Sequence, residues 1–383
     1  MRGHAERLNG LGTTIFAEMS ALAVATGSVN LGQGFPDTDG PDSVLEDAIA
    51  AIRAGANQYP PGRGIPALRQ AIADHQQRFY GLSYDPDTEV LVTTGATEAI
   101  AAALLAFVEP GAEVIALEPY YDSYAAGIAF AGGRRVPVTL RAPSYRLDLD
   151  ELRAAVTPRT KVLLINSPHN PTGTVLTDEE LRGIRDVAVE HDLTVITDEV
   201  YEHLVYDDHR HLPLATYDGM PERTLSISSA GKTFSVTGWK IGWVTGTPAN
   251  ITAVTTAKQF LTYVSGSPFQ PAVANALALG NDYYTTVRGT LQSRRDLLAT
   301  GLADLGFDVH TPAGTYFITT DIRPLGHTDG IDFCRLLPQR TGVVAIPTQV
   351  FYDHKPQGAP LVRWAFCKKE SLLQEALHRL KSL

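Results

Sequence analysis

The sequence predicts an α/β protein whose main sheet is mostly parallel. Between about residues 90 and 245, seven short runs rich in apolar residues alternate with segments of helical periodicity. Runs such as 161–166 are apolar almost throughout, which is typical of strands that are buried on both faces. These two observations indicate a sheet covered by helices on both sides, and ligands of such sheets bind at the carboxyl ends of the strands.

The expected elements follow in chain order. Helices are expected over 43–53 and 65–79, the second after the turn-forming segment 60–64. The seven expected strands cover 89–92, 113–117, 135–140, 162–166, 194–197, 224–228 and 241–245. After Pro271, a long helical stretch should run to about Leu305, a strand pair should cover 308–322, and a last helix should begin at Lys369. We therefore expect a large domain over 41–275, a smaller α+β domain over 276–383, and an N-terminal arm over 1–40 that packs in part with the smaller domain.

Composition excludes several classes of function. The chain has 42 acidic and 32 basic residues and no basic stripe, which argues against a nucleic-acid partner. Its longest apolar run, 99–108, is far shorter than the ~20 residues of a membrane helix, and no apolar signal core follows the N-terminus. The two cysteines, Cys334 and Cys367, form neither a metal spacing nor a disulfide framework, so we expect a cytoplasmic protein.

Lys232 is the side chain best suited to covalent chemistry. It lies in the segment Ser-Ser-Ala-Gly-Lys-Thr-Phe at 228–234, and Lys240 follows eight residues later. A lysine amine attacks carbonyl groups only when it is neutral, and burial or a nearby cation such as Lys240 favours that form. The small residues before Lys232 leave room for a bulky ligand, and Ser229 with Lys240 would suit a phosphate. These features together point to pyridoxal phosphate.

Polar residues at the ends of three other runs suit the same cofactor. A carboxylate at a buried strand end, Asp198, can keep a pyridine nitrogen protonated, and Tyr201 could reach the ring oxygen. Asn170 lies in a loop that the prolines and glycine of 166–173 restrain. Backbone N–H groups of Ala96 and Thr97, after Gly95, would form an anion site at a helix start. Taken singly, each could instead be a helix cap, a turn or an ordinary strand–helix connection.

Two further residues have both a structural and a functional interpretation. Tyr121, at the end of another run, could stack on a flat cofactor or pack in the core. Arg363 is the lone charge in the apolar segment 361–366, where its planar fork suits a substrate carboxylate or an internal salt bridge.

Together these segments resemble the class I aminotransferases of the fold type I pyridoxal-phosphate enzymes over nearly the whole chain. The lysine segment, Leu-Gly-Gln-Gly-Phe-Pro-Asp at 31–37 and Ile-Asn-Ser-Pro-His-Asn-Pro-Thr-Gly at 165–173 are similar to the kynurenine and glutamine transaminase branch. Long stretches also resemble actinobacterial N-succinyldiaminopimelate aminotransferases. The resemblance implies a large domain with a mostly parallel seven-stranded sheet, a smaller α+β domain, and a homodimer.

The resemblance also implies a role for each candidate residue. Lys232 would be the Schiff-base lysine and would shuttle the substrate proton, while Asp198 would pair with the pyridine nitrogen. Asn170 and Tyr201 would bind the ring oxygen, and Tyr121 would stack on the ring. The phosphate would be held by Gly95, Ala96, Thr97, Ser229 and Lys240, with Tyr59 reaching it across the dimer interface. The substrate α-carboxylate would be held by Arg363, Asn170 and the backbone of Gly34.

Two departures from the family pattern concern Lys240, where many members have arginine, and Tyr121, where tryptophan or phenylalanine is common.

The expected reaction is a ping-pong transfer of an amino group from an L-amino acid to a 2-oxo acid. Kynurenine, glutamine, aromatic amino acids, methionine and N-succinyldiaminopimelate all stay open as donors. A cysteine-conjugate β-lyase on the same scaffold also stays open.

Alternatives of other classes fit less well. Gly231-Lys232-Thr233 could end the phosphate loop of a nucleotide hydrolase, but that loop needs glycine where Ser226 stands. No G-x-G-x-x-G supports a dehydrogenase. No metal is expected, because we interpret His203, His209 and His211 as part of a solvated turn.

Overall fold

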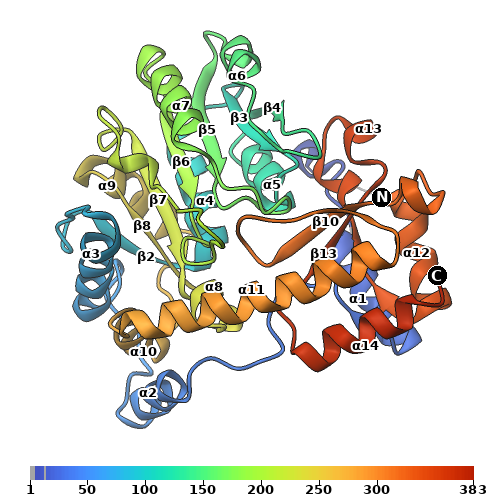
Figure 1. Cartoon of the computed structure of the whole chain (residues 1–383). Coiled ribbons are helices and arrows are strands. Elements are labelled where there is room, and N and C mark those ends of the chain that lie inside the picture. The colour runs from blue at the N-terminus through green and yellow to red at the C-terminus, as the bar shows by residue number, and fades with distance from the viewer. Residues whose placement is uncertain (1–4, 13) are drawn as a thin grey trace.

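The computed structural model describes residues 5–12 and 14–383, and its largest element is a seven-stranded sheet (Figure 1). The sheet has the order β2-β8-β7-β6-β5-β3-β4. Its strands are β2 (Val90–Thr94), β3 (Glu113–Glu118), β4 (Arg134–Thr139), β5 (Thr160–Asn166), β6 (Thr194–Asp198), β7 (Thr224–Ser229) and β8 (Ile241–Thr245). β8 runs antiparallel to both of its neighbours, and the other pairings are parallel. The predicted seven strands and mostly parallel sheet are confirmed.

Helices cover both faces of this sheet, which explains why its strands are apolar almost throughout. One face packs against α4 (Gly95–Phe107), α5 (Asp122–Phe130) and α9 (Pro248–Lys258), and Leu164 and Ile196 point to that side. The other face packs against α6 (Leu149–Ala155) and α7 (Asp178–Glu190), and Leu163 and Val195 point there. Because successive side chains of a strand face opposite sides, a strand between two helical layers is buried at every position, which favours apolar residues on both of its faces.

A third group of helices packs on the β2–β8 edge and shares one apolar cluster. These are α2 (Asp42–Arg53), α3 (Pro66–Tyr80) and α10 (Phe269–Leu277). Helix α3 ends in a Schellman-type cap at Gly81, where φ is 70°. This end lies within two residues of the predicted boundary.

The C-terminal part of the chain forms a small antiparallel sheet with its own helices. The sheet has the order β12-β13-β10-β9, with β9 (Asp308–His310), β10 (Phe317–Asp321), β12 (Ile346–Pro347) and β13 (Leu361–Ala365). β9 and β10 are the predicted strand pair. The surrounding helices are α11 (Asn281–Asp304), α12 (Gly330–Thr341), α13 (Lys355–Gly358) and α14 (Glu370–Leu380), with the 3-10 turns η4 (Arg323–Leu325) and η5 (Thr348–Phe351).

The N-terminal arm packs against this C-terminal part rather than against the large sheet. The arm contains η1 (Glu6–Leu8), α1 (Ile15–Thr26) and β1 (Val29–Asn30), and β1 pairs with β11 (Val343–Val344). Met19 and Leu31 share a buried apolar cluster with Trp364. Figure 1 shows the long α11 running from α10 to the side of the small sheet. We keep 1–40, 41–275 and 276–383 as proposed domain boundaries on this basis.

The long helical stretch predicted after Pro271 is divided into two parts. The structure has two helices, α10 and α11, because the chain leaves helical geometry between Leu277 and Asn281. Gly280 caps α11 with an extended backbone, and glycine is a poor residue for a helix interior.

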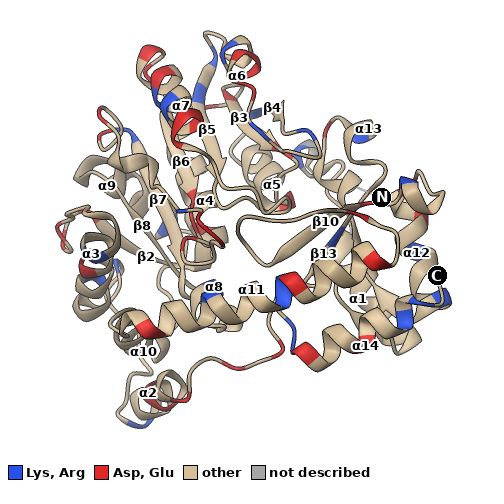
Figure 2. Cartoon of the chain, in the orientation of Figure 1, with Lys and Arg blue, Asp and Glu red and all other residues tan. Residues whose placement is uncertain are grey.

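The surface carries charges of both signs and gives no sign of a membrane span. Figure 2 shows acidic and basic residues interspersed along α7, α11 and α14. Among the described residues, none of the helices combines the length and the apolar composition needed to cross a bilayer.

Gly242 of β8 lets two backbones meet at the start of α4. A Cβ atom at Gly242 would lie 2.6 Å from the carbonyl carbon of Gly95 and 2.7 Å from the nitrogen of Ala96. No side chain fits between these backbones, so β8 and the first turn of α4 are held in one fixed arrangement.

We therefore predict that Gly242→Ala destabilises the protein by about 1–3 kcal/mol, because the added methyl group overpacks a site formed by backbone. Denaturant unfolding measures the change. Gly238→Ala is the matched control, since a Cβ atom there meets nothing within 4 Å. Equal unfolding free energies for the two variants would contradict the prediction.

Candidate active site

A cavity of about 1030 Å³ lies where the carboxyl ends of the central strands meet the N-terminal arm. The last residues of β5, β6 and β7, which are Asn166, Asp198 and Ser229, all line it. Apart from Tyr59, the predicted site residues all line this one cavity: Gly34, Gly95, Ala96, Thr97, Tyr121, Asn170, Asp198, Tyr201, Ser229, Lys232, Lys240 and Arg363. The fold thus brings together residues from the arm, the large sheet and the small sheet.

Tyr59 lies away from this cavity. Its ring is 81 % exposed and packs edge-on against Tyr263, with 5.5 Å between the ring centroids. It borders a separate hollow formed by 57–60 and 264–268. The family resemblance implies that Tyr59 reaches the site of a partner subunit. Its exposed side chain is accessible for that role.

Lys232 follows β7 in the short helix α8 (Ala230–Thr233), and its amine is held by a tyrosine. Nζ donates a hydrogen bond of 2.9 Å to the hydroxyl of Tyr316. Burial lowers the pKa of Lys232 from 10.5 to about 8, and the charges of Lys240 and Arg363 act in the same direction. The neutral fraction of this amine near neutral pH is therefore far larger than that of an ordinary lysine, as nucleophilic and proton-transfer chemistry require.

Tyr316 is a site residue that the sequence analysis missed. Its hydroxyl donates to the carbonyl oxygen of Gly34 at 2.5 Å while accepting from Lys232. Its ring meets that of Tyr201 edge-on, with 5.2 Å between centroids. Tyr316 thus fixes the lysine, the Gly34 loop and Tyr201 relative to one another. Nothing in the local pattern around Tyr316 distinguishes it from an ordinary core tyrosine.

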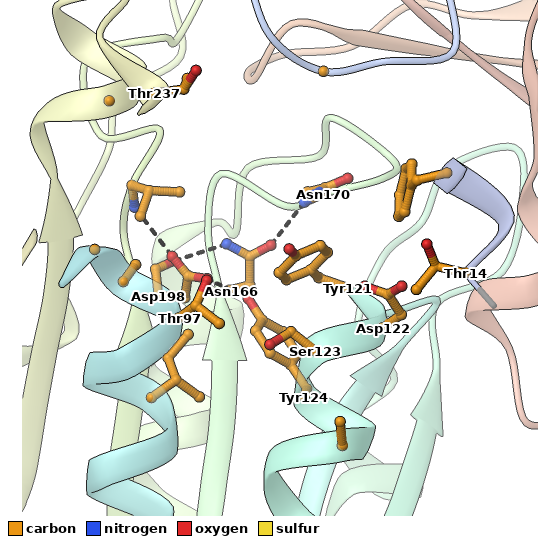
Figure 3. A pocket seen from close by; sticks show the side chains of 18 of the residues that line it. Thr14, Thr97, Tyr121, Asp122, Ser123, Tyr124, Asn166, Asn170, Asp198 and Thr237 are labelled. Carbon is orange, nitrogen blue, oxygen red and sulfur yellow. Dashed lines mark hydrogen bonds between the residues drawn. The ribbon is translucent and has the colours of Figure 1, made fainter. Parts of the chain in front are cut away.

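A chain of hydrogen bonds positions the polar groups at the strand ends (Figure 3). The Asn166 side chain donates to the Asp198 carbonyl at 2.8 Å, and its oxygen accepts from the Asn170 backbone at the same distance. The Asp198 carboxylate accepts from the hydroxyl of Tyr124, one helical turn after Tyr121, and from the Val200 backbone. Tyr124 was also missed, although its spacing from Tyr121 was a usable signal.

Asp198 is a buried carboxylate, with 5 % of the residue exposed. Burial raises its pKa above 3.8, and the hydrogen bond from Tyr124 opposes that change. A buried carboxylate in this state gains from a cationic ligand such as a protonated ring nitrogen.

An anion pocket lies at the start of α4. The Gly95 backbone has φ of 71°, and the Nζ atom of Lys240 lies 3.2 Å from the position that a Cβ atom of Gly95 would take. Lys240 itself has left-handed geometry, with φ of 55°, after the turn η3 (Thr237–Trp239). Ser229 and Thr237 also line this part of the cavity. Helix N–H groups, hydroxyls and an amine suit a phosphate.

Arg363 is a buried cation whose internal partners are neutral. It is 1 % exposed, and its guanidinium donates to Asn170 Oδ1 at 3.0 Å and to the Gly32 carbonyl at 2.9 Å. Its carbon Cζ lies 3.9 Å from the centroid of the Phe317 ring. Within the described ranges, no carboxylate lies at salt-bridge distance, and the Nε atom has no hydrogen-bond partner. The internal salt bridge considered for Arg363 is therefore absent, and the guanidinium is free to bind an anion in the cavity.

The solvated-turn interpretation of the histidines was wrong for two of them. His209 is exposed, but the His211 side chain is 3 % exposed and meets Glu199 at 3.0 Å. His203 is part-buried against His75 of α3. The spacing of the histidines could not reveal that His203 contacts His75, because α3 lies far from His203 in the sequence.

Comparison with known proteins gives consistent similarities. The family model for aminotransferase class I and II matches residues 26–380. The chain is 55 % identical to a probable N-succinyldiaminopimelate aminotransferase of Mycobacterium tuberculosis, over 98 % of each protein. It is 40 % identical to a methionine aminotransferase of Escherichia coli, over 98 % of this chain and 97 % of that protein. The solved structure of the M. tuberculosis N-succinyldiaminopimelate aminotransferase covers 99 % of both chains with a TM-score of 0.97 and 56 % identity.

We predict that the Lys232 amine of the folded, ligand-free chain titrates near pH 8. The rate at which an amine-reactive reagent modifies Lys232, followed by peptide mass spectrometry, should rise with pH and level off above that value. Tyr316→Phe should lower the apparent pKa further, because the lost hydroxyl accepts a hydrogen bond from the ammonium form. The urea-unfolded chain is the control and should titrate near 10.5. A folded-state value near 10.5 would contradict the prediction.

Proposed function

We propose that this chain, which belongs to the class I and II aminotransferases, uses pyridoxal phosphate to move an amino group from an L-amino acid to a 2-oxo acid. One observation carries the proposal. The same cavity holds Lys232, whose pKa is lowered, and Arg363, whose buried guanidinium has no carboxylate partner among the described residues. An amine for carbonyl chemistry beside a free carboxylate-binding site is what an amino-acid substrate requires.

The residues present fit this cofactor. Gly95, Ala96, Thr97, Ser229 and Lys240 would hold the phosphate, with Tyr59 of the partner subunit. Asp198 would pair with the ring nitrogen, Asn170 and Tyr201 with the ring oxygen, and Tyr121 would lie on the ring. When bound, pyridoxal phosphate supplies a ring that accepts the electron pair left by loss of the substrate α-proton.

The protein's own contribution is to orient groups and to move a proton. Arg363 and Asn170 bind the α-carboxylate, and the backbone of Gly34 closes that end of the site. The Nζ atom of Lys232 takes the α-proton in its neutral form and returns a proton in its charged form. Tyr316 keeps Nζ in place during this exchange, since its hydroxyl accepts from the amine. The 2-oxo acid of the second half-reaction uses the same carboxylate clamp, which is the basis of a ping-pong mechanism.

For the amino donor we propose N-succinyldiaminopimelate. The support is the 55 % identity to the M. tuberculosis relative along nearly the entire chain. A second donor class, methionine or aromatic amino acids, is favoured by the lining of the cavity. Its outer part carries mainly apolar side chains: Leu8, Leu11, Ile15, Phe16, Phe35 and Phe130. A donor with an apolar side chain would lose less hydration there than a donor with a distal carboxylate.

We also propose a homodimer located in the cytoplasm. Tyr59, Phe260, Leu261 and Tyr263 are exposed by 81, 83, 47 and 50 %, and Tyr59 contacts Tyr263. A patch of this kind on a folded protein favours contact with a partner. Both cysteines, Cys334 and Cys367, are buried free thiols, which fits a reducing compartment.

A donor panel tests the proposed function. Each donor is added singly to purified protein, and the cofactor absorbance is followed with 2-oxo acid formation. We expect N-succinyldiaminopimelate to react fastest and Lys232→Ala to be inactive. Faster reaction with methionine or an aromatic donor would select the second class. Release of pyruvate and ammonia from a cysteine conjugate, without amino transfer, would favour the β-lyase. Protein that binds no pyridoxal phosphate would contradict the proposal as a whole.

We predict that Arg363→Lys lowers kcat/KM for the amino donor by roughly 10- to 150-fold. Lysine keeps the charge but loses the planar fork, and a hydrogen bond to a charged group contributes about 1.5–3 kcal/mol. Steady-state kinetics measure the effect. The control is Arg335→Lys, because Arg335 pairs with Glu18 on the surface and should leave kcat/KM unchanged. An unchanged kcat/KM in Arg363→Lys would remove Arg363 from the carboxylate clamp.

A further inference from the structure

Three side chains that take no part in the proposed reaction lie together outside the cavity, two of them buried and one part-buried. We propose that His75, Glu202 and His203 bind a divalent transition-metal ion of the zinc class. One potential ligand atom of each residue lies within 4.8 Å of those of the other two. Two imidazoles and one carboxylate are a ligand set that zinc uses in proteins, with a fourth position left for water.

These residues belong to two elements that are far apart in the sequence. His75 lies in α3, and Glu202 and His203 lie in the turn directly after Tyr201. The group is separate from the cavity, because consecutive residues of β7 face opposite sides. Ser229 lines the cavity, whereas the Ser228 hydroxyl donates to Glu202 at 2.5 Å.

The two imidazoles already present their Nε2 atoms to each other, 2.7 Å apart. A tetrahedral ion with bonds of about 2.0–2.1 Å needs its nitrogens roughly 3.3 Å apart. The rings would therefore separate by about 0.6 Å to admit an ion between them.

An unpartnered carboxylate oxygen at this place indicates that a ligand is missing. Glu202 Oε2 is buried and has no hydrogen-bond partner within the part of the chain that the structure describes. Ser228 fixes the other carboxylate oxygen of Glu202, which is how second-shell groups orient metal-binding carboxylates. A buried carboxylate that has one free oxygen is stabilised by a cation.

The neighbouring charges do not supply that cation. Arg78 of α3 lies over the rings of Phe79 and Tyr284 and donates to Asn281 and to the Leu279 carbonyl. His211 pairs with Glu199 at 3.0 Å. Tyr80 brings a hydroxyl to the Glu202 carboxylate, and this group donates a hydrogen bond but carries no positive charge. A bound metal ion would supply a positive charge to this group.

Metal binding would join α3 to the segment that carries Tyr201. Because Glu202 and His203 follow that residue directly, an ion held between them and His75 would restrain the turn beneath the cavity. Its main effect is stability, since an ion that binds only the folded state raises the melting temperature by mass action.

The experiment uses the full-length chain after dialysis against a chelator. Zn²⁺ is titrated by calorimetry, and Co²⁺ is titrated by visible absorption, which reports tetrahedral coordination. We expect one equivalent to bind, a higher melting temperature with Zn²⁺, and a loss of affinity of at least about tenfold in His75→Leu and in the isosteric Glu202→Gln. His209→Leu is the matched control, because this exposed histidine of the same turn lies outside the group.

Two results would overturn the inference. The first is no stoichiometric binding of either ion by the wild-type chain, which would leave a proton shared by His75 and His203. The second is equal binding in wild type, His75→Leu and Glu202→Gln, which would place the ion elsewhere. Circular dichroism checks that each variant folds, and Glu202→Gln serves if His75→Leu does not. Aminotransferase activity is not a readout, so failure here is independent of the proposed reaction.

Discussion

Burial of the central strands on both faces is the constraint from which the rest of the molecule follows. Helices α4, α5 and α9 on one side and α6 and α7 on the other leave no face on which the central strands of the sheet are open to water. The polar residues that line the cavity are therefore found where strands end. Asn166, Asp198 and Ser229 are the last residues of β5, β6 and β7, and the parallel arrangement places all three at one edge.

That edge collects positive charge in a chain of net charge −10. Lys232, Lys240 and Arg363 line the cavity, and Asp198 is the buried carboxylate among them. Burial makes the charged forms of Lys232 and Arg363 costly, as their lowered pKa values, to about 8 and to about 10, indicate. A ligand with a phosphate and a substrate with a carboxylate would offset that cost. The same electrostatics therefore favour both the cofactor and the substrates that we propose.

The alternation of side chains along β7 separates two polar networks that lie only one residue apart. Ser229 faces the cavity, and Ser228 faces Glu202 and the histidines of α3 and its neighbouring turn. Tyr201 and Glu202 divide in the same way, since Tyr201 lines the cavity and Glu202 does not. The packing around Ser228 and Glu202 thus helps to hold Ser229 and Tyr201 in place. A substitution at His75 can therefore alter the stability of the active site, although His75 does not line the cavity.

The sequence by itself determined the sheet and its seven strands, because these depend on local periodicity. Short motifs pointed to several residues that line the cavity, and the family resemblance added others, among them Gly34. Tertiary structure decided which groups hold those residues in place. Tyr316 contacts Lys232 across 84 residues, and Tyr124 contacts Asp198 across 74. His75 meets His203 across 128 residues, so a turn that looked solvated is part-buried. No local pattern encodes such contacts. They arise only when the folded chain closes long loops and removes these side chains from water, which is also what shifts their pKa values.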